Sequence, residues 1–174
     1  MTVIKKYTLN SVFKQILIFI GLVLLQVLFL NKVNIGGYVN PYIFPLYILL
    51  LSLDTKKWNL LVSAFFLGLF IDLFNGTIGM HVFATVFVAY LRPIFIKTFS
   101  SKSDKINYPS LKENGFSWML FYVFTLIFIH HFIYFFIEVG SLTNFFHTIL
   151  LIFLSSIVSV FIIFLLLYTF INKK

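Results

Sequence analysis

The sequence predicts an all-α, polytopic membrane protein with six transmembrane helices in a single domain, residues 1–174. Its residues are 61% hydrophobic and only 10% charged, whereas soluble domains are roughly 45 to 50% apolar and about 25% charged. Inside a bilayer only helices and closed barrels satisfy every backbone polar group. The apolar residues form long uninterrupted runs that do not alternate with polar residues, which favours helices over a barrel.

Five apolar runs between polar stretches predict five of the helices. We expect them at about residues 13–30, 58–74, 80–96, 116–139 and 145–171. These lengths agree with the roughly 17 to 25 residues that a helix needs to cross the hydrocarbon core. Only the turn from Asn75 to Gly79 separates two of these runs. The helices on either side of that turn should therefore be antiparallel neighbours.

The sixth predicted span, at about residues 35–53, is less regular than the others. Gly36, Gly37, Pro41 and Pro45 interrupt its first half. The stretch is compatible with a full span, a broken helix or a re-entrant segment.

The distribution of positive charge supports six crossings. With six spans, twelve of the thirteen Lys and Arg residues lie on one side of the membrane and only Lys32 lies on the other. Basic loops stay in the cytoplasm, so we expect both termini and the loop at 97–115 to be cytoplasmic. If residues 35–53 did not cross, the later loops would change sides relative to the N-terminus, and the split of twelve to one would weaken to ten to three.

Several functional classes are excluded by composition and motif. The formal net charge of +8 does not indicate nucleic-acid binding, because the basic residues are dispersed over helix ends and loops. The chain has no cysteine, which excludes disulfides, thiolate metal sites and cysteine nucleophiles. Gly-x-Ser-x-Gly, Gly-x-x-x-x-Gly-Lys and His-Glu-x-x-His motifs are absent from the sequence. We therefore predict a protein that is not an enzyme and that has no cofactor.

Small residues and one carboxylate share a face of the helix at 58–74. Ala64, Gly68 and Asp72 recur every four residues, and small residues let a neighbouring membrane helix approach closely. An ionisable residue at such a place is a functional candidate. Three roles stay open for Asp72: hydrogen bonding to loop amides or capping of the next helix, contact with a partner, and proton or ion coupling. We favour the first, because Asp72 lies only a few residues before the turn.

Arg92 and Pro93 are expected to end the helix at 80–96 on the cytoplasmic side. Proline breaks helices there, and arginine meets lipid phosphates. The alternative is that the pair braces a neighbouring helix. Arg92 lies about thirteen residues into its helix, which places it roughly 20 Å from Asp72 at 1.5 Å per residue. His81, just after the turn, is therefore the better partner for that carboxylate.

Four polar side chains are expected near the outer ends of the helices: His81, His131, Glu138 and His147. His131, Tyr134 and Glu138 are spaced by three and four residues, so they share one helix face. Histidines with a carboxylate are suitable metal ligands. The ligands are scattered singly along the chain, however, so we predict polar contacts between helices or at the interface and no metal site.

The run from Gly68 to Met80 resembles the signature of the rod shape-determining protein MreD family. It reads Gly-Leu-x-x-Asp-Leu followed by Gly-Thr-x-Gly-Met. The matched positions are Gly68, Asp72, Gly76, Gly79 and Met80. The Arg92-Pro93 pair, the run Leu24–Leu28 and the proline-opened segment Tyr42–Leu53 also resemble the versions found in Bacteroidetes-type bacteria. The architecture matches along the whole chain, and specific residues match from about 64 to 93.

The resemblance implies a non-enzymatic inner-membrane scaffold or regulatory subunit of the cell-elongation machinery. It implies that the protein acts with an MreC-like protein, a RodA-like glycosyltransferase, a class B penicillin-binding transpeptidase and an MreB-like filament. Together these would control peptidoglycan synthesis and cell shape. The matched residues would shape the hairpin and a partner-facing surface within membrane lipid.

The resemblance also implies a fold similar to the six-helix substrate-binding subunits of energy-coupling-factor vitamin transporters. Since fold does not determine function, the alternative is a transporter subunit that captures a small vitamin-like molecule. Such a protein should offer convergent polar side chains in its outer half. The candidates are His81, His131, Glu138, Asn144 and His147.

Overall fold

The structure is a computed structural model that describes residues 2–33, 39–99, 109–140 and 144–171. The fold of these residues is all-α, as predicted, and five of their helices are long and apolar enough to span a membrane. These are α1 (Thr2–Leu28), α3 (Lys57–Asn75), α4 (Met80–Phe99), α6 (Phe116–Val139) and α7 (Phe145–Leu166). Shorter elements are η1 (Leu30–Lys32), α2 (Leu46–Leu50), α5 (Leu111–Asn114) and η2 (Leu167–Ile171).

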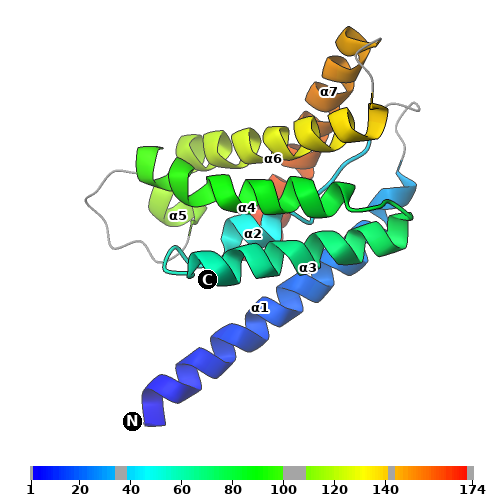
Figure 1. The fold of residues 1–174 in the computed structure, drawn as a ribbon. Helices are drawn as coiled ribbons and strands as arrows, with labels where there is room; N and C mark the ends of the chain where they lie inside the picture. The colour runs from blue at the N-terminus through cyan, green and yellow to red at the C-terminus, as the bar shows by residue number, and fades with distance from the viewer. Residues whose placement is uncertain (1, 34–38, 100–108, 141–143, 172–174) are drawn as a thin grey trace.

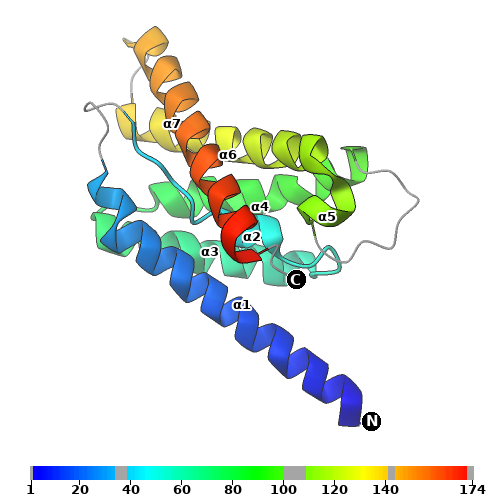
Figure 2. The same cartoon turned by 180° about the vertical axis from the view of Figure 1, so that it is seen from behind.

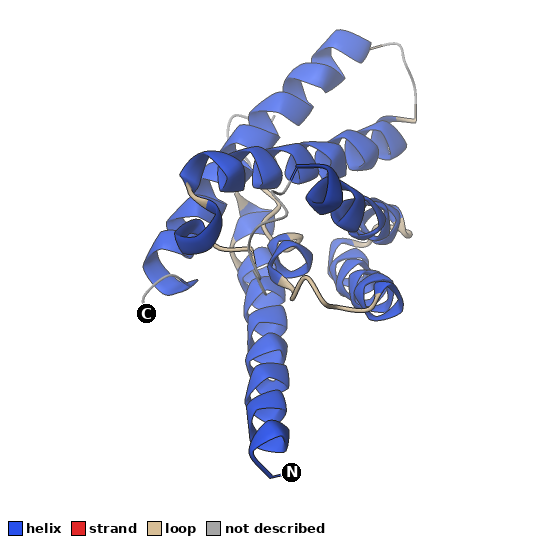
Figure 3. Ribbon diagram, turned by 90° about the vertical axis from the view of Figure 1, so that its left-hand side faces the viewer, coloured by secondary structure: helices blue, strands red, loops and turns tan. Residues whose placement is uncertain are grey.

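The long helices pack in the order α1, α3, α4, α6, α7, because each contacts the next. Figure 1 and Figure 2 show α3, α4 and α6 in a row, with α7 crossing them obliquely. In Figure 3, α1 runs away from this group toward its N-terminus. Along residues 12–21 of α1 the side chains are exposed or half-buried. Within this stretch Phe19 already packs on the bundle, with its ring 5.2 Å from that of Tyr47 and 5.9 Å from that of Phe70. Phe13 and Ile16, nearer the N-terminus, are exposed.

The predicted hairpin is present. α3 ends at Asn75 and is capped by Gly76, whose φ of +67° is the left-handed conformation that glycine adopts without strain. The N–H groups of Gly76 and Thr77 both donate to the carbonyl of Asp72. α4 begins at Met80 and packs along α3. These contacts make the two helices antiparallel neighbours.

Pro93 does not end α4. We expected the helix to stop at Arg92 and Pro93, but it continues to Phe99. Proline has no N–H, so the helical hydrogen bond to the carbonyl of Ala89 is missing. α4 continues in spite of this one lost hydrogen bond. The predicted loop at 97–115 is correspondingly shorter, and residues 100–108 lie outside the described part.

The stretch predicted as a span at 35–53 is not a continuous helix. In its described part, residues 40–43 have no regular secondary structure, Phe44 and Pro45 form a turn, and Leu46–Leu50 form the short helix α2. Every residue from Pro41 to Leu49 is buried. Of the three alternatives that the sequence left open, the structure has the broken form.

This broken segment runs from one end of the bundle toward the other. Near its start, the carbonyl of Pro41 accepts a hydrogen bond from Gln26, close to the end of α1. Near its finish, the carbonyl of Leu51 accepts one from Arg92, which lies twelve residues after the start of α4 and so about 18 Å along it. Non-helical residues rise at most about 3.3 Å each and helical ones about 1.5 Å, so the segment from Pro41 to Leu51 can cover roughly 24 Å, which exceeds this depth. We call Pro41–Leu51 the broken crossing.

The two ends of the bundle differ in charge. We call the end at which α3 begins and α4 finishes the basic end, since Lys56, Lys57 and Lys97 are exposed there. At the opposite end, Asn31 after α1 donates a hydrogen bond to Asn75 at the end of α3.

Candidate functional site

The carboxylate of Asp72 is buried and binds groups of its own hairpin. One oxygen, Oδ1, accepts hydrogen bonds from the Thr77 hydroxyl at 2.5 Å and from the His81 backbone N–H at 3.1 Å. The other, Oδ2, accepts from the Val82 N–H at 2.9 Å. Asp72 thus satisfies two of the N–H groups that open the first turn of α4, where the helix dipole favours negative charge. This is the capping role that the sequence favoured.

The small-residue face of α3 lies against α4. Ala64 is fully buried, and Gly68 brings the two backbones into contact. A Cβ on Gly68 would lie 2.5 Å from the Cα of Val82. Met80, the last residue of the matched motif, is half-buried at the start of α4.

Arg92 is buried within the bundle and contacts its backbone, contrary to the expectation that it meets lipid phosphates. Its side chain is 2% exposed, and its guanidinium donates to the carbonyl of Leu51 and, at 3.0 Å, to the hydroxyl of Tyr122. The Tyr122 hydroxyl in turn donates to the carbonyl of Leu49 at 3.0 Å. The structure therefore has the alternative arrangement, in which Arg92 braces a neighbouring segment.

Side chains from α1 and α7 form hydrogen bonds with backbone groups at the other end of the broken crossing. Gln26 donates to the carbonyl of Pro41 at 3.0 Å and accepts from the N–H of Ile43 at 2.9 Å. The Ser159 hydroxyl accepts from the N–H of Tyr42 at 2.9 Å. Ser155 accepts from the N–H of Asn40, just before the segment, at 3.2 Å. Irregular backbone is tolerated at membrane depth only where protein groups replace its missing hydrogen bonds in this way.

Three buried histidines surround Tyr42 of the broken crossing. The ring of His81 stacks on Tyr134 at 4.2 Å and lies 4.9 Å from the ring of Tyr42. His131 lies 5.3 Å from Tyr42, and its Nε2 is 3.3 Å from the Ser159 hydroxyl. The Nδ1 atoms of His81 and His130 are buried without a hydrogen-bond partner.

His81 contacts Asp72 through its backbone N–H, whereas its ring bonds elsewhere. The ring Nε2 lies 3.2 Å from the amide nitrogen of Asn75. Glu138 accepts a hydrogen bond from Tyr134 at 3.1 Å and is exposed. His147 is also exposed, in the first turn of α7. The structure thus buries His81 and His131 together and leaves Glu138 and His147 at the surface.

A polar cavity of about 290 Å³ opens at the opposite end of the bundle. Leu30 and Pro41 line it together with seven polar residues: Asn31, Asn40, Tyr42, Asn75, Thr77, Tyr134 and Glu138. Of the described residues that line it, Glu138 is the single acidic one and none is basic. Within the described ranges, no group of three His, Asp or Glu side chains is arranged to hold a metal ion.

Sequence reasoning missed the residues that hold the broken crossing. Ser155 and Ser159 lie one turn apart in a helix that is otherwise strongly apolar, and Gln26 interrupts the apolar run of α1. Polar residues inside membrane helices usually bind another protein group. The four-residue spacing of the two serines and the isolated Gln26 could therefore have indicated residues that bind another segment.

These features define a polytopic helical membrane protein whose buried polar side chains chiefly support its own backbone. Comparison of the chain with protein-family models, with curated proteins and with solved structures gives no match.

Proposed function

We propose that this protein is a non-enzymatic scaffold or regulatory subunit of the bacterial cell-elongation complex, located in the inner membrane. The resemblance of Gly68–Met80 to the MreD signature supports this function. One structural observation supports it most directly: the carboxylate of Asp72 makes three hydrogen bonds within its own hairpin. A carboxylate used in this way fixes the geometry of the hairpin, which is the structural role that a scaffold needs.

The partners in this proposal are an MreC-like protein, a RodA-like glycosyltransferase, a class B penicillin-binding transpeptidase and an MreB-like filament. The excess of positive charge at the basic end supports a cytoplasmic position for that end and for both termini. α1 supports contact with a membrane helix of a partner, because Phe13, Ile16 and Ile20 are exposed along it and its N-terminal end runs away from the bundle.

Co-purification tests the proposal. The protein is extracted gently together with an MreC-like partner, and Asp72→Ala is compared with Asp54→Ala, which removes an exposed carboxylate from a turn. If the capped hairpin forms the partner surface, Asp72→Ala should reduce recovery of the partner while the variant remains inserted. Asp54→Ala should leave recovery unchanged.

A double variant in α1 separates loss of partner contact from loss of fold. Phe13→Ala with Ile16→Ala changes exposed side chains of α1 and leaves the packed helices intact. If α1 contacts the partner, this variant should recover less of it without a change in thermal stability. Unchanged recovery with both the hairpin variant and the α1 variant would contradict the scaffold proposal.

A different function is favoured by the polar cavity at the opposite end. A transporter subunit that captures a small vitamin-like molecule needs convergent polar groups, and Asn75, Tyr134 and Glu138 line this cavity. Its volume of about 290 Å³ is at the lower limit of ligand pockets, about 300 Å³. Mass spectrometry of the purified protein tests this function. A retained small molecule that is lost in Tyr134→Phe with Glu138→Gln would favour capture over scaffolding.

A further inference from the structure

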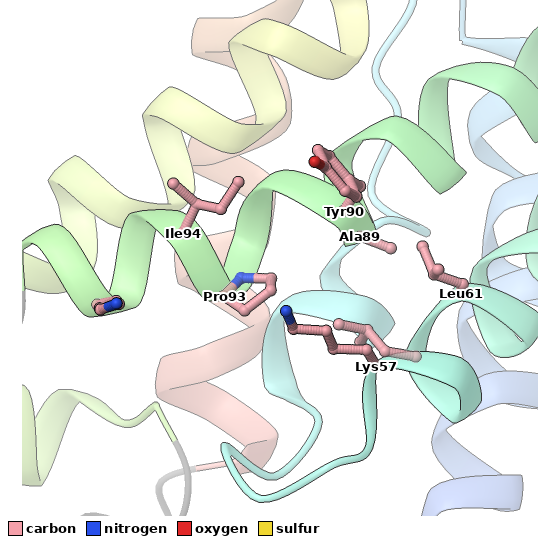
Figure 4. Close-up of a pocket in the computed structure, with 8 residues that line it drawn as sticks. Lys57, Leu61, Ala89, Tyr90, Pro93 and Ile94 are labelled. Atoms are coloured by element: carbon pink, nitrogen blue, oxygen red, sulfur yellow. The ribbon is translucent and has the colours of Figure 1, made fainter.

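A groove between α3 and α4 at the basic end has a charged mouth and an apolar interior. Its volume is about 370 Å³, and Lys57, Leu61, Tyr90, Pro93, Ile94 and Lys97 are among its lining residues. Figure 4 shows Lys57 reaching from the start of α3 toward Pro93 of α4, with Leu61, Ala89 and Tyr90 deeper along the helices.

The order of these residues along α4 matches the polarity of a lipid. From Lys97 to Tyr90 the helix rises about 10 Å toward the middle of the bundle. A ligand that follows the groove therefore meets ammonium groups first and aliphatic side chains afterwards. Ile94 is 50% exposed, so the groove is open on the outer side of the helix pair, where membrane lipid lies.

The charge at the mouth is unbalanced. Lys57 and Lys97 are both exposed, and no carboxylate is among the described residues that line the groove. α3 also begins here, with Lys56 as an N-cap whose side chain makes no capping hydrogen bond. Backbone N–H groups of the first turn and the positive end of the helix dipole therefore add to the attraction for an anion.

We propose that this groove binds one anionic phospholipid. The phosphate lies between the ammonium groups of Lys57 and Lys97, and an acyl chain packs against Leu61, Ala89 and Ile94. Basic pockets between membrane helices are suited to anionic headgroups. A soluble phosphate would leave the apolar part of the groove empty, and an uncharged lipid would leave both lysines without a counter-charge.

Native mass spectrometry with defined lipids tests this site. The full chain in detergent is titrated with phosphatidylglycerol or with phosphatidylcholine of the same acyl composition. Each membrane-surface lysine contributes about fivefold to binding of anionic lipid. Wild-type protein should therefore prefer phosphatidylglycerol by roughly tenfold or more, and Lys57→Gln with Lys97→Gln should lose most of that preference.

The matched control removes the same charge elsewhere. Lys14→Gln with Lys32→Gln changes two exposed lysines of the α1 region, which does not line the groove. This variant should keep the preference for phosphatidylglycerol. An equal loss in both double variants would mean that only net charge matters, and would overturn the proposal.

A variant whose groove is filled distinguishes a lipid-binding groove from a simple patch of surface lysines. Ile94→Trp keeps Lys57 and Lys97 but occupies the apolar part of the groove, and it should weaken phosphatidylglycerol binding about as much as loss of one lysine. Full binding by this variant, or displacement of the lipid by millimolar inorganic phosphate alone, would overturn the assignment. A bound polypeptide in place of lipid on this face would do the same.

Discussion

Gly68 of α3 contacts the backbone of Val82 in α4 with no space for a side chain between them. A Cβ on Gly68 would lie 2.5 Å from the Cα of Val82 and 2.7 Å from its nitrogen. The neighbouring atoms are backbone atoms and cannot rotate away. The two N–H groups that Asp72 binds belong to His81 and Val82, so this close approach and the cap depend on each other.

Gly68→Ala should destabilise the protein, although alanine is the better helix former. Separation of α3 from α4 should cost about 1 to 3 kcal/mol, the range for overpacked sites. Gly21→Ala is the matched control, because nothing lies within 4 Å of a Cβ at Gly21 in α1. This control should be neutral or more stable by up to about 1 kcal/mol. Thermal unfolding in detergent measures both, and equal stability of the two variants would contradict the contact.

The hairpin was predictable because its determinants lie close together in the sequence. Asp72, Gly76 and Thr77 fall within six residues, and the amides of His81 and Val82 follow directly. Small residues at four-residue spacing indicate close helix packing whatever the partner helix is. The role of Asp72 could thus be inferred before its hydrogen bonds were seen.

The broken crossing was not predictable in the same way. Its backbone groups are satisfied by residues far away in the chain: Ser159 is 117 positions from Tyr42, and Tyr122 is 73 from Leu49. Local sequence only shows that Pro41 and Pro45 disturb a helix. Whether the disturbed segment stays at membrane depth depends on donors and acceptors that other helices bring.

The hydroxyls of Ser155 and Ser159 should stabilise the broken crossing. Replacing both by alanine leaves the N–H groups of Asn40 and Tyr42 without these acceptors, at about 1 to 3 kcal/mol for the buried Tyr42 group and less for the half-buried Asn40 group. Ser156→Ala is the control, because among the described residues that hydroxyl bonds the carbonyl of Ile152, in its own helix. Detergent unfolding should show a large loss for the double variant and a small one for the control. A loss of equal size in both would refute the role of these serines.

Arg92 and Tyr122 should act as one unit. The Arg92 guanidinium donates to the Tyr122 hydroxyl, and both donate to carbonyls of the broken crossing. We expect Tyr122→Phe to cost about 1 to 3 kcal/mol and Arg92→Gln at least as much. Residues in one hydrogen-bond network show coupling of about 0.5 to 3 kcal/mol, so the double variant should lose less than the sum of the two single variants. Strict additivity in this cycle would show that the two side chains act separately.

Cysteine labelling tests the topology without interference, because the chain has no native cysteine. Single cysteines are placed at Thr2, Asp54, Ile78 and Glu113. If the broken crossing traverses the membrane, Thr2→Cys and Asp54→Cys lie on the same side, and Glu113→Cys lies with them. Ile78 is 95% exposed in the turn between α3 and α4. Ile78→Cys should therefore react with an impermeant reagent added to intact cells.

The pair Thr2→Cys and Asp54→Cys decides the number of crossings. α1 is the only long helix between these positions, so a segment that returned to its own side would put the two cysteines on opposite faces. A segment that crosses restores the same face and leaves both cysteines unreactive until the membrane is permeabilised. Reaction of Asp54→Cys in intact cells, with Thr2→Cys protected, would therefore remove the sixth crossing. The later lysine-bearing loops would then lie on the opposite side of the membrane from the N-terminus. The distribution of positive charge would no longer support a cytoplasmic position for both termini.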